Sequence, residues 1–86
     1  MIYEITTLEQ FKKVKSNKVG FIVIVDNYNQ EDNKIHTPDC RTVMEEGFQK
    51  KVLNNNNKTG NYFYSDTIEE AKTKIGAREC KICKPQ

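Results

Sequence analysis

This 86-residue sequence contains no tryptophan, one histidine, three cysteines and two prolines. Hydrophobic residues make up only 36% of the chain, and charged residues make up 30%. A domain of this size buries so little apolar surface that its own core stabilises it only marginally. We therefore expect a further source of stability, which can be a disulfide, a metal ion or a partner.

Long hydrophobic runs are also missing. The longest is residues 21–25, far shorter than the roughly 20 residues of a membrane-spanning helix. The first four residues are neither basic nor followed by an apolar stretch, so no signal peptide is expected. An odd number of cysteines argues against a complete disulfide framework. These absences predict a cytoplasmic protein without membrane contact, whose thiols stay reduced and available to a metal.

Patterns typical of enzymes are missing as well. The sequence has no paired carboxylates, no glycine-rich phosphate loop and no Ser-His-Asp set. If the single histidine, His36, binds a metal, the chain also lacks an ordinary general base for neutral pH. We therefore expect that this protein is not an enzyme.

The scarce residues are arranged as two close pairs. His36 and Cys40 form an H-x3-C pair, and Cys80 and Cys83 form a C-x2-C pair. These four residues include every cysteine and the only histidine. Two such pairs let two short turns hold one tetrahedral ion, and zinc is the usual one. The pattern predicts one zinc site with His36, Cys40, Cys80 and Cys83 as its ligands.

Two other interpretations of these residues are less favoured. A thioredoxin-like redox pair lies at the start of a helix after a strand, whereas Pro85 follows Cys83 almost at once. A hydrolytic zinc site has three protein ligands and an open position for water. Four ligands of this type close the coordination sphere. We therefore expect a structural zinc ion, on which folding of the chain depends.

Hydrophobic periodicity predicts strands that alternate with helices. Strands are expected at residues 3–5, 21–25 and 62–64, with 21–25 as the central strand because it is the most apolar and β-branched segment. Ile35 is expected to return along this strand and deliver His36. The chain is therefore predicted to be an α+β domain, in which a small antiparallel sheet with packed helices is stapled by one structural zinc.

Capping signals predict where the helices begin and end. The first helix begins at Thr6 or Thr7, because either residue has a capping-box partner three positions later. The last begins at Asp66 and ends at Gly76 in a left-handed cap. Between them, Thr37-Pro38 has the form of an N-cap and first helical residue. This middle helix is expected to pass through residues 43–44 and to break at Gly47.

The His36-x3-Cys40-Arg41 pattern is followed, after a central segment, by an ending in which Gly76 precedes the C-x2-C pair and Lys84-Pro85. Residues 35–85 thereby resemble the zinc domain of the Ada DNA-repair methyltransferase and related small Ada-like zinc modules. The resemblance implies a bound zinc ion and a role on DNA, and the length of the chain predicts a single domain over residues 1–86. Residues 1–34 have no counterpart in that family and are expected to form a strand-helix-strand extension.

The resemblance also bears on methyl transfer. In the Ada domain four cysteine thiolates hold zinc, and the first also accepts a methyl group from a DNA phosphotriester. His36 stands at that first position here, and imidazole cannot replace a thiolate as the acceptor. Cys40, Cys80 and Cys83 remain as thiolates that can be alkylated. Structural zinc is favoured over sacrificial repair.

Two functions stay open at this point. A DNA-binding module would present Arg41, Lys81 and Lys84 to phosphates beside the metal, which gives affinity without reading the sequence. A protein-interaction or regulatory module would instead use an apolar patch, or a strand edge at 21–25 or 62–64 that could also form a homodimer. The net charge of +2 falls to about +1 with three thiolates and one zinc ion, which is modest for nucleic-acid binding. The resemblance favours DNA.

Overall fold

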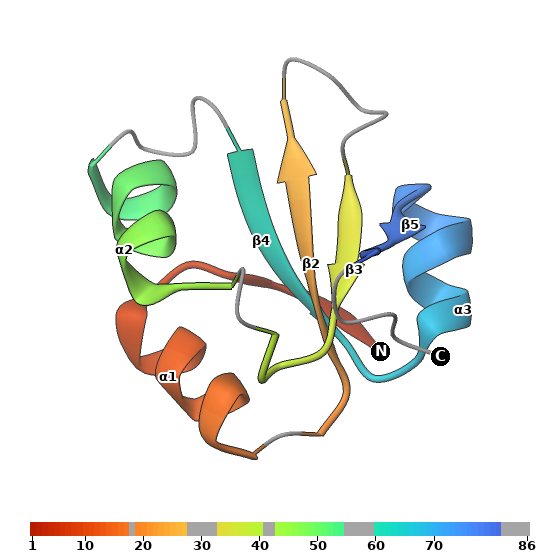
Figure 1. Ribbon diagram of the computed structural model, residues 1–86, viewed down its shortest axis with the longest axis horizontal. Coiled ribbons are helices and arrows are strands. Elements are labelled where there is room, and N and C mark those ends of the chain that lie inside the picture. The colour runs from red at the N-terminus through yellow and green to blue at the C-terminus, as the bar shows by residue number, and fades with distance from the viewer. Residues whose placement is uncertain (18, 28–32, 41–42, 55–59, 82–86) are drawn as a thin grey trace.

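The computed structural model describes residues 1–17, 19–27, 33–40, 43–54 and 60–81. The elements follow in the order β1 (Ile2–Ile5), α1 (Leu8–Asn17), β2 (Phe21–Asp26), β3 (Lys34–His36), α2 (Glu45–Phe48), η2 (Gln49–Asn54), β4 (Gly60–Ser65), α3 (Ile68–Glu70), η3 (Ala71–Ile75) and β5 (Arg78–Glu79). The π-helical turns η2 and η3 follow α2 and α3 without a break, so each pair forms one continuous helix (Figure 1).

The five strands form one mixed sheet in the order β1-β4-β2-β3-β5. The pairs β1–β4, β4–β2 and β2–β3 are antiparallel, whereas β5 joins β3 in parallel. The α+β class is thereby confirmed, and the sheet departs from the expected antiparallel arrangement only at β5. Parallel pairing needs a long connection, and here the chain passes through β4 and the helix of α3 and η3 before it returns beside β3.

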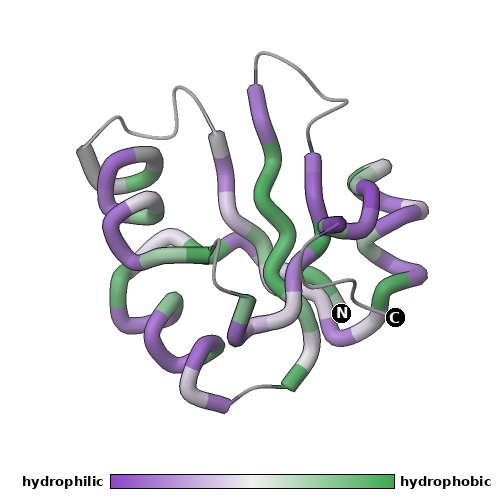
Figure 2. The backbone as a smooth tube through the Cα atoms, in the orientation of Figure 1, coloured by the Kyte–Doolittle hydropathy of each residue, from purple (hydrophilic) through white to green (hydrophobic). Residues whose placement is uncertain are grey.

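The predicted central strand is confirmed as β2, which is the long hydrophobic stretch at the centre of Figure 2. β2 pairs with β3 and β4, and β4 pairs with β1 and β2. Residues 21–25 and 62–64 are therefore interior, and the expectation that either offers a strand edge to a partner is wrong. Within the described part of the chain, the edges of the sheet are β1 and β5.

Each face of the sheet has its own hydrophobic core, because successive side chains of a strand point to opposite faces. Ile22 packs in the larger core, with residues of α1 and α2, and its neighbour Val23 packs in the smaller core, with residues of α3 and η3. Figure 1 shows α1 and α2 together on the left of the sheet and α3 on the right. The buried residues of the larger core are Ile5, Phe11, Val14, Ile22, Cys40, Val43, Phe48, Val52, Tyr62 and Cys80.

Helix α1 begins at a capping box, as predicted for Thr7. The Thr7 hydroxyl accepts a hydrogen bond of 3.2 Å from the backbone N–H of Gln10. In return, the side-chain oxygen of Gln10 (Oε1) accepts one of 3.3 Å from the backbone N–H of Thr7. The buried ring of Phe11 stacks on Phe48 with 4.7 Å between centroids, and Tyr62 meets both rings edge-on. Burial raises the pKa of Tyr62 to about 12.

The middle helix begins later than predicted and does not break. Residues 37–40 form a turn closed by a backbone hydrogen bond of 3.0 Å, and α2 begins only at Glu45. The helix runs through Gly47 and continues as η2. A Cβ atom at position 47 would lie 3.3 Å from the hydroxyl oxygen of Tyr62. This glycine therefore allows a close approach of the helix to the sheet, and it does not end the helix.

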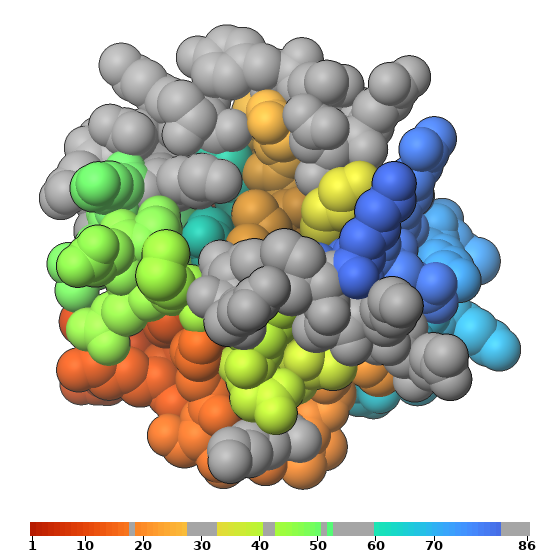
Figure 3. All heavy atoms as spheres, in the orientation of Figure 1, coloured from red at the N-terminus to blue at the C-terminus, as the bar shows by residue number. Residues whose placement is uncertain are grey.

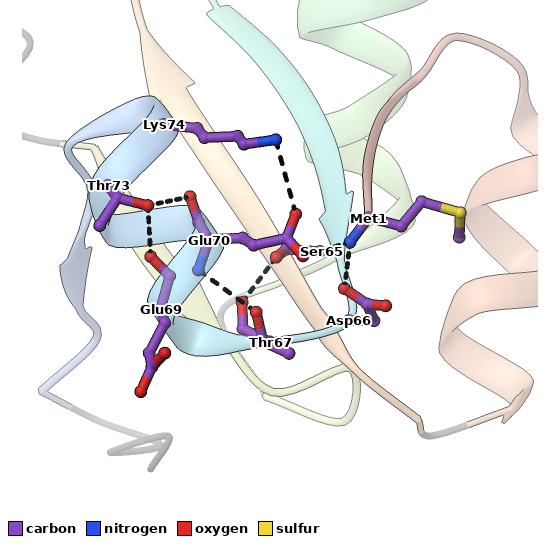
Figure 4. A network of polar contacts seen from close by, with 8 residues as sticks. All are labelled: Met1, Ser65, Asp66, Thr67, Glu69, Glu70, Thr73 and Lys74. Atoms are coloured by element: carbon purple, nitrogen blue, oxygen red, sulfur yellow. Dashed lines mark hydrogen bonds and ion pairs between the residues drawn. The ribbon is translucent and has the colours of Figure 1, made fainter.

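The last helix is capped one residue later than predicted. The Thr67 hydroxyl accepts a hydrogen bond of 3.2 Å from the N–H of Glu70, so Thr67 is the N-cap. Asp66 instead accepts one of 2.6 Å from the terminal ammonium of Met1, which also contacts Glu70 (Figure 4). The Met1–Asp66 bond raises the pKa of the amine and lowers the pKa of Asp66. The helix ends at Gly76 with a φ of 76°, which confirms the left-handed cap.

Candidate metal centre

Strands β3 and β5 place His36 and Cys80 side by side. His36 is the last residue of β3, and β5 runs beside it in the same direction with Glu79 opposite Ile35. Cys80 continues this register by one residue, because its backbone N–H donates to the carbonyl oxygen of Ile35 at 2.9 Å. Parallel pairing of two short strands therefore joins a histidine and a cysteine that are far apart in the sequence.

Cys40 is brought to the same place by the turn that follows β3. The backbone N–H of Cys40 donates to the carbonyl oxygen of Thr37 at 3.0 Å. Pro38 occupies the second position of this turn, where its fixed φ is favoured, and it is buried. The turn reverses the chain directly after His36, so the H-x3-C spacing returns Cys40 toward the histidine that precedes it.

The side chains of His36, Cys40 and Cys80 form a buried cluster that can hold a metal ion. Their ligand atoms, one ring nitrogen and two sulfurs, all lie within 4.8 Å of one another. A tetrahedral zinc ion with Zn–S bonds of about 2.3 Å separates two sulfurs by about 3.8 Å, so small movements bring these atoms to coordinating distances.

The surroundings of the cluster also fit a metal ion. The exposed fraction of the residue is 6% for His36, 4% for Cys40 and 6% for Cys80, and both cysteines belong to the larger hydrophobic core. A thiolate in such a core is costly unless a cation neutralises it. Two sulfurs and an imidazole nitrogen are the donors that zinc prefers. Three of the four predicted ligands are thus together in the structure.

Of the remaining predicted site residues, the structure describes only Lys81. Cys83, Arg41 and Lys84 lie outside the described residues, so their predicted roles stay predictions. Lys81 directly follows Cys80 and is exposed, as a phosphate-contacting side chain must be.

Two further cations lie beside the cluster, and the sequence analysis did not find them. Lys34 and Arg78 face each other in the register of β3 and β5. Because side chains two residues apart share a face of the sheet, Lys34 lies on the face of His36, and Arg78 on the face of Cys80. Figure 3 shows the side chains of β5 (blue) beside those of β3 (yellow) on one surface. We call Lys34, Arg78 and Lys81 the cationic strip.

The cations of the strip form no ion pairs within the described part of the chain. Among the described residues, no ion pair involves Lys34, Arg78 or Lys81. The nearest acid along β5 is Glu79, which points to the other face and pairs with Lys72 at 3.2 Å. The sequence predicted only Lys81 of these three residues, because Lys34 and Arg78 meet only through the parallel pairing of two strands.

Comparisons with models of protein families, with curated proteins and with solved structures gave no significant match. The Ada-like resemblance therefore stays a prediction from the sequence. In the described part of the chain, no helix is long and apolar enough to cross a membrane.

Proposed function

We propose that this chain is a non-catalytic module that binds one structural zinc ion and contacts nucleic-acid phosphates beside it. The ligands would be His36, Cys40, Cys80 and Cys83. The observation that carries the metal site is the buried cluster of three ligand atoms within 4.8 Å of one another. Cys83 is assigned as the fourth ligand because C-x2-C pairs commonly hold one zinc ion with both sulfurs.

The proposed ion would supply stability that the small sheet lacks. Strand β5 has two residues, and it holds the end of the described chain to the sheet. A zinc ion bound by the turn after β3 and by Cys80 would cross-link these two segments. Since the ligands are brought together only in the folded chain, the free energy of metal binding would add directly to the free energy of folding.

Chelation tests the metal site. We expect a strong zinc chelator to abolish the cooperative unfolding transition in circular dichroism and added zinc to restore it. Cys40→Ser and Cys80→Ser should give proteins that no longer respond to zinc. Val43→Thr is a matched control, because it places a hydroxyl in the same core without replacing a ligand. It should be less stable than the wild type but keep its response to zinc. An unchanged unfolding curve after chelation would refute a structural metal.

The cationic strip supports the nucleic-acid part of the proposal. Lys34 and Arg78 each lie two residues before a metal ligand, His36 and Cys80, and on the same face of the sheet. Lys81 follows Cys80 in the sequence. Phosphate oxygens that approach this face would meet Lys34 and Arg78, and Lys81 is exposed beside it; none of the three forms an ion pair with a described residue. Such contacts position a backbone and read no base. With a net charge of about +1 when zinc is bound, we expect weak binding that depends strongly on salt.

A salt titration of the zinc-loaded protein tests this part. Three phosphate contacts predict a slope of log K against log salt concentration of about −2.7 on duplex DNA and about −2.1 on a single strand. Arg78→Gln and Lys81→Gln should each weaken binding and reduce the magnitude of the slope by about 1. Lys50→Gln removes an exposed lysine from η2, outside the strip, and is the charge-matched control.

The control makes the outcomes of this titration distinct. If Lys50→Gln weakens binding as much as Arg78→Gln, the effect is one of net charge and the strip has no special role. If the zinc-loaded protein does not bind DNA at low salt, the nucleic-acid part of the proposal is wrong. The alternative of a zinc-stabilised protein-interaction module would then be favoured.

A further inference from the structure

Most of the large apolar side chains that are exposed in the described part of the chain lie at one place. The described residues include four large hydrophobic residues that are exposed: Met1 (61%), Tyr3 (37%), Val19 (64%) and Met44 (56%). The first three line a single pocket of about 600 Å³. A volume of this size is typical of small-molecule sites, and clustered exposure of apolar groups marks a binding surface more often than scattered exposure does.

The residues that line the pocket come mainly from helix α1 and from the strands β1 and β4. One side is formed by residues of α1 at positions i, i+3, i+4 and i+7, which lie on one face of a helix: Gln10, Lys13, Val14 and Asn17. The other side is formed by Tyr3 and Tyr64, whose rings stack with 5.0 Å between centroids and 28° between planes. The pocket thus combines an aromatic surface with two side-chain amides and one lysine.

The aromatic surface is held in place by close packing. A Cβ atom at Gly20 would lie 2.5 Å from the hydroxyl oxygen of Tyr64 and 2.7 Å from two of its ring carbons. Tyr64 therefore occupies the space that any other residue at position 20 would fill, and Tyr3 stacks on it. Because β1 is an edge strand of the sheet, Tyr3 lies at the margin, where it keeps 37% of its surface exposed.

The polar groups of the pocket favour a ligand with a hydrogen-bonding edge and a negative charge. The side-chain oxygen of Gln10 accepts hydrogen bonds in the capping box, so the NH2 group of the same amide is left to donate to a ligand. The side-chain amide of Asn17 offers both a donor and an acceptor. Lys13 forms no ion pair with a described residue. Asp66 and Glu70 are both bound to the Met1 ammonium, and Glu70 also pairs with Lys74 at 4.0 Å (Figure 4).

We propose that this pocket binds the base of a nucleotide. The base stacks on Tyr3, the amides of Gln10 and Asn17 bond to its polar edge, and Lys13 pairs with its phosphate. Unpaired bases are recognised in this way, by stacking on aromatic side chains together with hydrogen bonds to the base edge. The pocket lies at the β1 edge of the sheet and the cationic strip at the β5 edge. The two sites are therefore separate, and this inference goes beyond the phosphate contacts proposed above.

Binding of mononucleotides to the zinc-loaded protein tests the inference. Adenosine and cytidine monophosphates are titrated while the ring resonances of the tyrosines are followed by NMR, with ribose phosphate as a ligand that lacks the base. We expect saturable shifts of the Tyr3 and Tyr64 resonances with the nucleotides only. Tyr3→Leu should weaken binding about fivefold to a hundredfold, whereas Tyr3→Phe keeps the ring and should bind like the wild type.

Neighbouring lysines of α1 provide a second control. Lys13→Gln should weaken nucleotide binding about twofold to fivefold. Lys12→Gln removes the same charge from a side chain that points to Glu45 at 3.8 Å and should have no effect. Arg78→Gln should also leave mononucleotide binding unchanged, so failure of the cationic strip and failure of this pocket can be told apart.

The outcomes also identify the source of the base. Equal affinity for a mononucleotide and for each site of a single-stranded oligonucleotide indicates a free nucleotide, and tighter binding of the oligonucleotide indicates a strand. Both results support a base-binding pocket. The inference is overturned if nucleotides cause no saturable shift, if ribose phosphate binds equally well, or if Tyr3→Leu binds like the wild type while its NMR spectrum remains that of the folded protein.

Discussion

Alanine substitutions at two glycines with nearly the same backbone conformation distinguish two destabilising effects, backbone strain and a steric clash. Gly20 and Gly76 have φ values of 78° and 76°. A Cβ atom at Gly76 would have no heavy atom within 4 Å, whereas one at Gly20 would lie 2.5 Å from the hydroxyl oxygen of Tyr64. Gly76→Ala and Gly20→Ala therefore impose the same left-handed strain, and only the second also displaces the tyrosine.

The expected costs follow from these contacts. Left-handed strain at an alanine costs about 1–2 kcal/mol, part of which is offset by the lower entropy of the unfolded chain. We expect Gly76→Ala to lower the free energy of unfolding by about 1 kcal/mol. In Gly20→Ala the ring of Tyr64 must also move by about an ångström, and overpacking of this kind costs about 1–3 kcal/mol more. Its total cost is therefore about 2–4 kcal/mol.

Urea unfolding of the zinc-loaded variants, followed by circular dichroism, measures both costs. For a domain of this size, a loss of 1 kcal/mol lowers Tm by about 4–8 °C, so a thermal scan gives an independent check. The slope of the free energy against urea should be the same for both variants and the wild type. If Gly20→Ala is no less stable than Gly76→Ala, Tyr64 does not pack against Gly20, and the aromatic side of the proposed pocket is wrongly placed.

Three further predictions concern single side chains. Thr67→Ala removes the N-cap of the last helix and should lower the free energy of unfolding by about 1 kcal/mol; an effect as small as that of Thr73→Ala, a nearby exposed position, would contradict the assigned cap. Asp66→Asn should lower the pKa of the Met1 amine toward its ordinary value near 8.0, measured by NMR titration, and an unchanged pKa would show that this contact is not made in solution. Because burial raises the pKa of Tyr62 from 10.0 to about 12, its contribution to stability is complete below pH 10 and is lost as the pH rises toward 12, where the unfolded chain is the first to ionise. Tyr62→Phe should flatten this fall in unfolding curves recorded across that range, and an unaltered fall would assign it to other groups.

Local signals in the sequence predicted the elements that depend on a few neighbouring residues. The β-branched run at 21–25 became the central strand, because a segment buried on both faces has to be apolar throughout. The capping box at Thr7 and the left-handed Gly76 are likewise set by contacts within one turn of a helix. The H-x3-C pair was found for the same reason, since one turn returns Cys40 to His36.

The errors arose where a distant contact decided the structure. Gly47 was expected to end a helix, but the Tyr62 hydroxyl packs against it, and this contact belongs to the sheet. Aspartate is a common residue at the N-cap of a helix, but Asp66 binds the ammonium of Met1 instead. Lys34 and Arg78 meet only because β5 returns parallel to β3. None of these contacts has a signature in the residues next to it, so sequence patterns alone could not predict them.

The most direct test of the central claim is the metal content and coordination of the purified protein. We predict one zinc ion per chain, and an X-ray absorption spectrum with three sulfur neighbours at about 2.3 Å and one nitrogen neighbour at about 2.0 Å. The Cys80→Ser protein should contain little or no zinc, in agreement with its lost response to added zinc. A protein that folds cooperatively without bound metal would contradict the claim, and so would a zinc ion whose neighbours are mainly oxygen atoms.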